Sequence, residues 1–106
     1  MVPQKIAFTK QPPRWQVEVG QRLALTRVAL GLKDADLARY LGISQQRWHN
    51  YVSGIRPLQL ALAVKLCDRF KLTLDWLYRG DFSGLPFDLA QRMKPLDLGE
   101  TRQSTN

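Results

Sequence analysis

The side chains best suited to chemistry lie in a short polar stretch that follows Ser44. Glutamine and asparagine can form two hydrogen bonds with adenine in the major groove of DNA, and arginine can do the same with guanine. A helix surface that only faces solvent would more often carry Glu and Lys pairs, whereas this stretch contains a single charged residue. We therefore expect contacts with DNA bases, the alternative being an ordinary solvated helix face. The residues concerned are Gln45, Gln46, Arg47, His49 and Asn50.

Catalytic, metal and cofactor chemistry have much weaker support in the sequence. His49 is the only histidine and Cys67 the only cysteine, so we expect no zinc site and no intrachain disulfide. The acidic residues are separated along the chain and indicate no catalytic pair. There is also no glycine-rich phosphate loop. We therefore expect no enzymatic activity and no cofactor, and we expect Cys67 to be a small buried thiol in the core.

The composition favours a polyanionic partner. The 106 residues include 16 Lys and Arg against 9 Asp and Glu, which gives a formal net charge of +7 and a pI of about 10.1. Such a balance is typical of proteins that bind nucleic acid or an anionic membrane surface. No apolar run approaches the ~20 residues that a membrane span needs. Because the chain has one cysteine and no apolar N-terminal segment, we expect a cytoplasmic protein.

The basic excess is confined to residues 1–80, because residues 81–106 carry a net charge of −1. Proline-containing sequence at the N-terminus predicts an arm without regular structure. Its basic residues Lys5, Lys10 and Arg14 either follow DNA or only improve solubility. The predicted organisation is an N-terminal arm (1–13), a DNA-binding domain (14–80) and a C-terminal extension (81–106) that is a candidate for dimerisation and is expected to be disordered after Leu98.

Hydrophobic periodicity predicts an all-α fold with five helices and a few further helical turns in the extension. Apolar residues recur at steps of three and four from Trp15 to Leu30, which is typical of one buried helix face. Glycines follow several of the periodic segments, where they favour helix ends. Trp48 and Trp76, like Trp15, are expected in the core. The predicted helices span residues 13–30, 34–41, 45–52, 58–70 and 74–79, with one or two more turns over 86–93.

A tight turn with a characteristic spacing joins the second and third predicted helices. Ala38 is small enough for a close helix crossing, Gly42 can adopt the left-handed conformation of a tight turn, and Ser44 can cap the next helix. Trp48 then supplies a large apolar group. From about Arg22 to Gly80 the chain resembles the Cro/C1-type, or XRE, helix-turn-helix domains of lambdoid phage repressors. The matching segments are GLKDADLARYLGISQQRWHNYVSG and LTLDWLYRG.

This resemblance implies a compact five-helix domain whose third helix enters the major groove while the second lies across the DNA backbone. Members of the family usually bind as dimers to two-fold symmetric operators near promoters. By position, Gln45 and Gln46 match the pair of base-reading glutamines of one lambdoid repressor, which strengthens their assignment. The resemblance also implies phosphate contacts around the motif. Our candidates for these contacts are Lys33, Ser44, Ser53 and Arg56.

Two positions depart from the family pattern. Many members carry a glutamine that reaches a phosphate where this chain has Asp34, whose carboxylate suits the helix dipole but would repel DNA. Some members also pair an arginine of the first helix with a glutamate late in the third. Here Arg27 remains, but Val52 occupies the partner position. Arg27 is therefore expected to find another acceptor or to face solvent.

These observations favour a sequence-specific regulator of transcription that binds duplex DNA, acting as a dimeric repressor at an operator with an inverted repeat. The pairing surface is predicted among apolar residues such as Leu85, Phe87 and Leu89, unless the extension folds back onto its own domain. Two alternatives share the fold. One is an antitoxin that binds both a toxin partner and its own operator. The other is a protein-interaction module without DNA binding, for which Asp34 and Asp36 are the best support.

Overall fold

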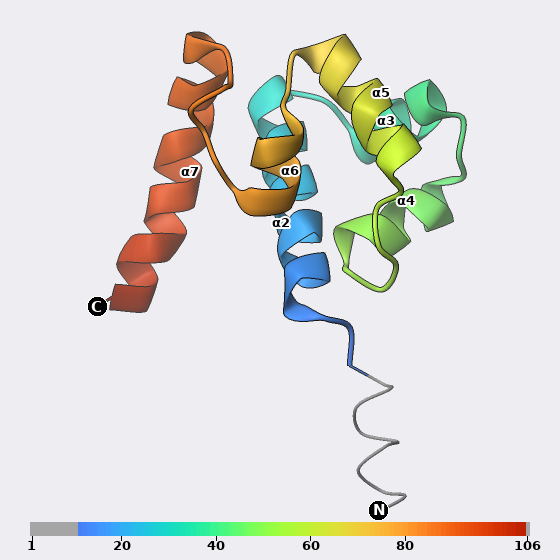
Figure 1. The fold of residues 1–106 in the computed structure, drawn as a ribbon, viewed down its shortest axis with the longest axis horizontal. Coiled ribbons are helices and arrows are strands. Elements are labelled where there is room, and N and C mark those ends of the chain that lie inside the picture. Colours follow the sequence, from blue (N-terminus) through green and yellow to red (C-terminus); the bar gives the residue numbers. More distant parts are fainter. Residues whose placement is uncertain (1–10, 106) are drawn as a thin grey trace, which may run out of the picture.

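The computed structural model describes residues 11–105, and the side chains of residues 11–96. This part of the chain contains six α-helices and no strand, which confirms the predicted all-α fold. None of the described helices is both long and apolar enough to cross a membrane. Helix α2 lies between α3 and α4 on one side and α7 on the other (Figure 1). The helices are α2 (Arg14–Leu30), α3 (Asp34–Leu41), α4 (Gln45–Val52), α5 (Leu60–Phe70), α6 (Leu74–Arg79) and α7 (Phe87–Thr105).

Helix α2 buries the face that its periodicity predicted, except in the first turn. Trp15 is 48% exposed, so its prediction as a core residue is wrong. The next residue, Gln16, is buried instead because its amide donates a 2.7 Å hydrogen bond to the carbonyl of Gly54. This bond joins the start of α2 to the loop that follows α4. The same face of α2 continues with the buried residues Val19, Leu23 and Thr26.

The turn between α3 and α4 has the predicted helix-turn-helix geometry. Gly42 has a φ of 73°, in the left-handed region that the turn requires. The hydroxyl of Ser44 then caps α4 by accepting a 3.0 Å hydrogen bond from the Arg47 backbone N–H. Ala38 and Trp48 are 2% and 1% exposed, so both predicted packing roles are confirmed.

A glycine that the sequence pattern did not single out determines how α2 meets α4. Gly20 lies buried in α2, and a Cβ atom at this position would overlap the backbone carbonyls of Tyr51 and Val52. Glycine is the residue that permits so close a backbone approach. The crossing of α2 over the end of α4 therefore depends on the missing side chain at position 20.

Helices α5 and α6 pack together, and α6 is also joined to α2. Helix α5 begins at Leu60, two residues later than predicted, because Gln59 is its N-cap. Thr73 caps α6 by accepting a 2.9 Å hydrogen bond from the Trp76 N–H. The indole of Trp76 donates in turn to the Thr26 hydroxyl at 2.9 Å. Trp76 is therefore buried, as predicted, and its polar atom is satisfied.

The single thiol lies on α5, at the border of the core. Cys67 is half-buried and packs against the core cluster, so it is less buried than predicted. Burial raises the pKa of the Cys67 thiol, and the negative charge of Asp68 raises it further. The thiol therefore stays protonated at neutral pH, which is typical of an unreactive structural cysteine.

The C-terminal extension forms a longer helix than the sequence predicted. Helix α7 extends from Phe87 to Thr105, so the prediction of only one or two helical turns over 86–93 is wrong. Pro95 lies inside the helix instead of ending it.

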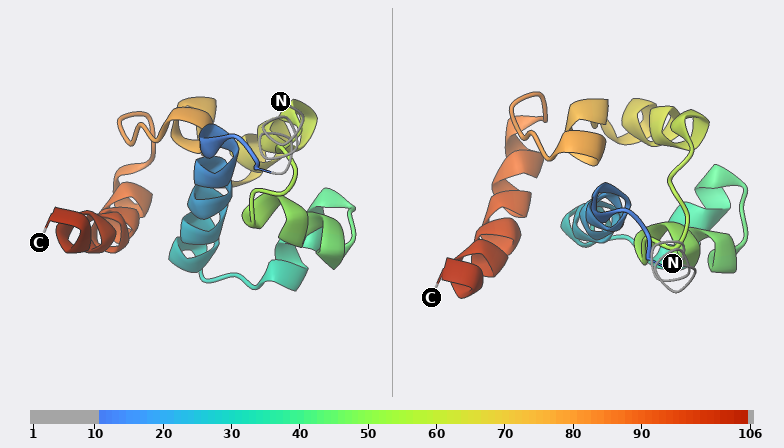
Figure 2. Two further views of the ribbon diagram at one scale, coloured as in Figure 1. Left: turned by 90° about the horizontal axis from the view of Figure 1, so that it is seen from below. Right: turned by 60° about the horizontal axis from the view of Figure 1, so that its bottom comes forward.

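The extension folds back onto its own domain. Leu85, Leu89 and Met93 are buried in the core, and α7 packs against α2 (Figure 2). Most of the predicted pairing surface is therefore covered within one chain, although Phe87 remains 74% exposed. Of the two arrangements predicted for the extension, the structure shows the one in which it folds back. Helix α4 stays free of it.

Candidate nucleic-acid interface

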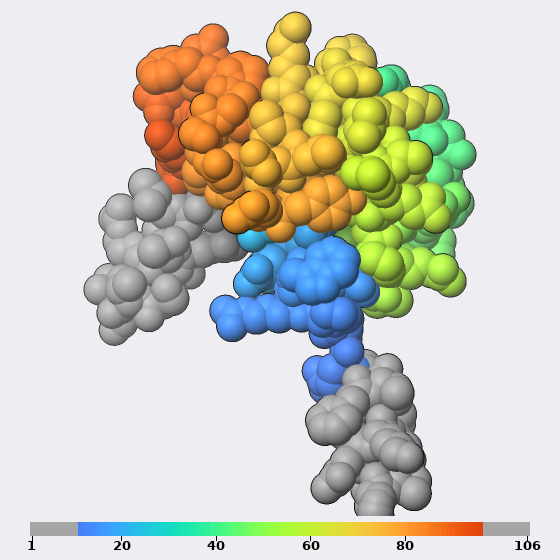
Figure 3. Space-filling model, in the orientation of Figure 1, coloured from blue at the N-terminus to red at the C-terminus, as the bar shows by residue number. Residues whose placement is uncertain are grey.

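Helix α4 presents a polar face at the molecular surface. Its large apolar side chains, Trp48 and Tyr51, are buried against the other helices. The remaining positions of the helix therefore point away from the core. Figure 3 shows the chain around α4, in green to yellow-green, at the edge of the molecule away from α7. The exposed residues of this face are Gln45, Gln46, His49 and, in part, Asn50.

Two amide side chains on this face bind each other. The Gln46 carboxamide nitrogen donates a 3.1 Å hydrogen bond to Oδ1 of Asn50, one turn later. Oε1 of Gln46 and Nδ2 of Asn50 keep no partner in the described part of the chain. Adenine presents one acceptor and one donor in the major groove. The pair thus offers a complementary donor and acceptor on a preformed unit.

Arg47, predicted on the same face, is engaged by its neighbours instead of extending freely. Its Nε donates a 2.8 Å hydrogen bond to the Tyr51 hydroxyl, and one Nη2 hydrogen goes to Oε1 of Gln59 at 2.9 Å. The guanidinium also lies 5.7 Å from the centre of the Tyr51 ring. Neither partner was predicted from the sequence. Spacing of four residues on a helix could have suggested Tyr51, but Gln59 carries no local signal.

The four predicted phosphate ligands border the motif at separate points. Lys33 is exposed just before α3, and its backbone N–H donates to Asp36 at 3.0 Å. The other three surround α4. Ser44 is its N-cap, Ser53 is its exposed C-cap, and Arg56 is exposed in the following loop.

A comparison with protein families assigns the chain to a known type of domain. The family model described as a helix-turn-helix domain matches residues 18–76, more than half of the chain. The protein belongs to this helix-turn-helix family. The match agrees with the resemblance to Cro/C1-type domains and indicates a DNA-binding regulator. No curated protein and no solved structure matches the chain.

Within the helix-turn-helix, Asp34 of α3 contacts one side chain on α4 and one on α2. Its Oδ1 accepts a 2.8 Å hydrogen bond from the Trp48 indole and lies 3.2 Å from Nε of Arg27. Arg27 also donates to the carbonyl of Leu32 at 2.8 Å. The two departures from the family pattern thus explain each other. Arg27, which faces no glutamate at Val52, uses the carboxylate of Asp34 instead.

This network reduces the expected conflict between Asp34 and DNA. The carboxylate is 57% exposed, but an adjacent guanidinium compensates its charge. Asp34 also lines a pocket of about 180 Å³ together with Gln45 and His49. A buried indole N–H normally needs an acceptor, and Asp34 supplies it for Trp48. The helix-turn-helix therefore uses the acidic residue to hold α4 in place.

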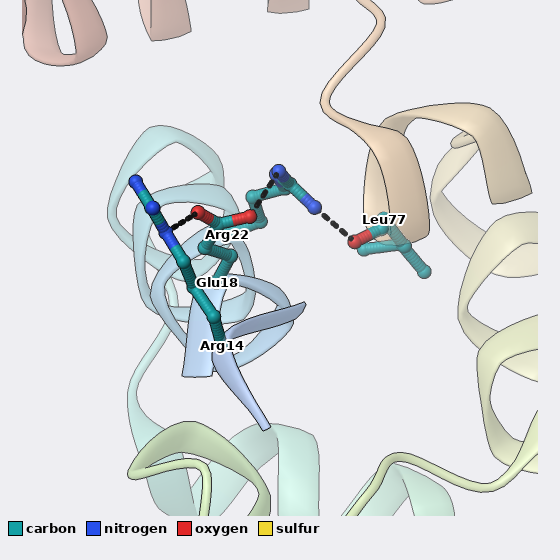
Figure 4. A network of polar contacts seen from close by, with 4 residues as sticks. All are labelled: Arg14, Glu18, Arg22 and Leu77. Atoms are coloured by element: carbon teal, nitrogen blue, oxygen red, sulfur yellow. Dashed lines mark hydrogen bonds and ion pairs between the residues drawn. The ribbon is translucent and has the colours of Figure 1, made fainter. Parts of the chain in front are cut away.

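A second polar network joins α2 to α6 (Figure 4). Glu18 accepts a 3.0 Å hydrogen bond from Arg14 and lies 3.7 Å from Arg22. Arg22 also donates to the carbonyl of Leu77 at 3.2 Å. Arg14, considered above as part of a DNA-following arm, is therefore paired within α2, and the two arm lysines lie outside the described residues. Arg22 has a structural role.

Proposed function

We propose that the protein is a sequence-specific regulator of transcription that places α4 in the major groove of duplex DNA. The observation that carries this proposal is the uncharged amide face of α4, exposed on a helix whose other side is fixed in the core. Amides at this position suit adenine, and the formal net charge of +7 attracts the DNA backbone. The proposed base-reading residues are Gln45, Gln46, His49 and Asn50.

The experiment begins with selection of a preferred site from a pool of random duplexes. Gln45→Ala should then weaken binding to the preferred site by about 1–3 kcal/mol and affect random DNA much less, because only base contacts carry sequence information. Gln91→Ala is the matched control, since Gln91 is an exposed glutamine on α7. Equal losses on both kinds of DNA for Gln45→Ala would contradict base reading by α4.

We further propose that the protein represses transcription as a homodimer. One α4 contacts only about half a turn of DNA, so a second copy about 34 Å along the groove would give a longer operator. The described side chains leave an apolar groove of about 320 Å³ between α2 and α7 as a candidate pairing surface. Its lining residues are Gln21, Ala24, Leu25, Val28 and Leu96.

Two measurements test the dimeric repressor. Light scattering should give a dimer on DNA, and the footprint should cover two inverted half-sites one helical turn apart. Placing the selected site over a promoter should lower reporter expression when the protein is present. A monomer that protects one half-site, or a reporter that responds with higher expression, would rule out the corresponding part of the proposal.

A further inference from the structure

A small cationic pocket lies between the end of α4 and the start of α5. Its volume is about 210 Å³, and no carboxylate contributes to its lining. Two of the lining side chains carry guanidinium groups, and the others are neutral. We call it the Arg47–Arg56 pocket. Its lining residues are Arg47, Tyr51, Arg56, Pro57 and Gln59.

The guanidinium of Arg47 is held in this pocket by neutral groups. Two of its five N–H donors bind the Tyr51 hydroxyl and the Gln59 carbonyl oxygen. Three donors therefore remain for a ligand. Neither partner removes the positive charge, and no carboxylate of the described residues lies within ion-pair distance of Arg47 or Arg56. Arg47 is thus oriented in advance without being neutralised.

We propose that the Arg47–Arg56 pocket binds one backbone phosphate of duplex DNA, and that Arg47 contributes affinity and not base selection. A phosphate is an anion with several acceptor oxygens, which suits two arginines that line the same pocket. A guanine edge is neutral and occupies only one of them. Tyr51 and Gln59 are positioning residues, because they orient Arg47 and do not themselves contact the ligand. The inference rests on the proposed DNA binding.

The test compares the wild-type protein and its variants on the selected duplex and on random duplex over a range of salt concentrations. Arg47→Ala should lose affinity equally on both, on the order of tenfold. The slope of log affinity against log salt should fall by about one. Gln59→Glu should give a similar result, because the new carboxylate neutralises Arg47. Gln91→Glu makes the same charge change on α7 and should have a smaller effect.

A second probe identifies the phosphate directly. In a series of duplexes, one phosphate at a time is replaced by an uncharged methylphosphonate. At one position in each half-site, the replacement should lower the affinity of the wild-type protein but leave the affinity of Arg47→Ala unchanged. A loss for Arg47→Ala that is confined to the selected duplex would overturn the inference and restore Arg47 as a base reader, leaving the proposed function intact. A wild-type protein without a preferred duplex would instead overturn the proposed function. If Arg47→Ala unfolds, Gln59→Glu decides the question, since it leaves every residue of α4 unchanged.

Discussion

Helix α2 packs against α3 and α4 on one side and against α7 on the other, and these two contacts are built differently. Toward α3 and α4, the backbones approach closely at Gly20, and Arg27 is paired with Asp34 at 3.2 Å. Toward α7, the contact consists mainly of buried apolar groups such as Leu89 and Met93. The packing of α2 against α3 and α4 thus depends on contacts with a defined geometry, whereas its packing against α7 depends on the volume of buried apolar side chains.

The difference follows from what each side must do. Hydrogen bonds lose their strength when their angle or length changes, so they specify where α4 lies relative to α2. Apolar packing tolerates rearrangement as long as volume is conserved. A helix that is proposed to read bases needs a defined position, whereas the buried contact between the extension and the core can tolerate small shifts. Substitutions on the two sides should therefore separate DNA binding from stability.

The largest effect is expected at Trp48, which belongs to both the core and the polar network. Trp48→Ala should lower the free energy of unfolding by about 3–5 kcal/mol, because it leaves a large cavity. Trp48→Phe keeps an aromatic ring but loses the N–H that binds Asp34, and should cost only about 1 kcal/mol. Chemical denaturation measures both. If Trp48→Ala denatures like the wild type, the orientation of α4 described here is wrong.

For Trp48, the burial could be predicted from the sequence but the hydrogen-bond partner could not. Ala38, Gly42, Ser44 and Trp48 lie within eleven consecutive positions, so their roles follow from local geometry and were predicted. The Asp34 bond to Trp48 joins residues fourteen positions apart and depends on the packing of two helices. Local patterns do not contain that information.

Two further misses have the same physical origin. Spacing alone allowed Trp15 to be buried, but the tertiary bond between Gln16 and Gly54 selects the neighbouring position. Likewise, Gln59 orients Arg47 across twelve residues. The helical motif was thus predictable from sequence, whereas the orientation of its functional side chains required the fold.

On the apolar side, Met93→Ala should lower stability without changing DNA recognition. Met93 is fully buried, so the expected loss is about 2–5 kcal/mol. Affinity for the selected duplex, measured well below the melting temperature, should remain that of the wild type. Lys94→Ala, on the exposed side of the same helix, is the control. A selective loss of DNA affinity in Met93→Ala would show that α7 helps to position α4.

On the α4 side, Gly20→Ala tests the close backbone approach. The added methyl group would displace the end of α4, at a cost of about 1–3 kcal/mol. Because α4 itself moves, DNA affinity should also fall in the population that remains folded. Gln91→Ala, at an exposed position of α7, should leave both quantities unchanged. Wild-type affinity in a folded Gly20→Ala protein would mean that this approach does not set the position of α4.

The smallest effect is expected for Asp34→Asn, which separates geometry from charge. Asparagine keeps an oxygen for the Trp48 indole but removes the ion pair with Arg27. Both side chains are partly exposed, at 57% and 28%, so water and salt screen the pair and its loss should cost about 1 kcal/mol or less. Thermal unfolding should show this cost at low salt, and it should shrink at high salt.

The same variant should not weaken DNA binding, because it removes a negative charge from the start of α3. Affinity for random duplex should rise slightly at low salt, and sequence preference should be retained. Asp36→Asn is the matched control, since it makes the same charge change two residues further along α3 without touching Arg27 or Trp48. If Asp34→Asn loses affinity while Asp36→Asn does not, the Arg27 ion pair itself holds α4 in its binding position. The contrast between the two sides of α2 would then rest on charge as well as on hydrogen-bond geometry.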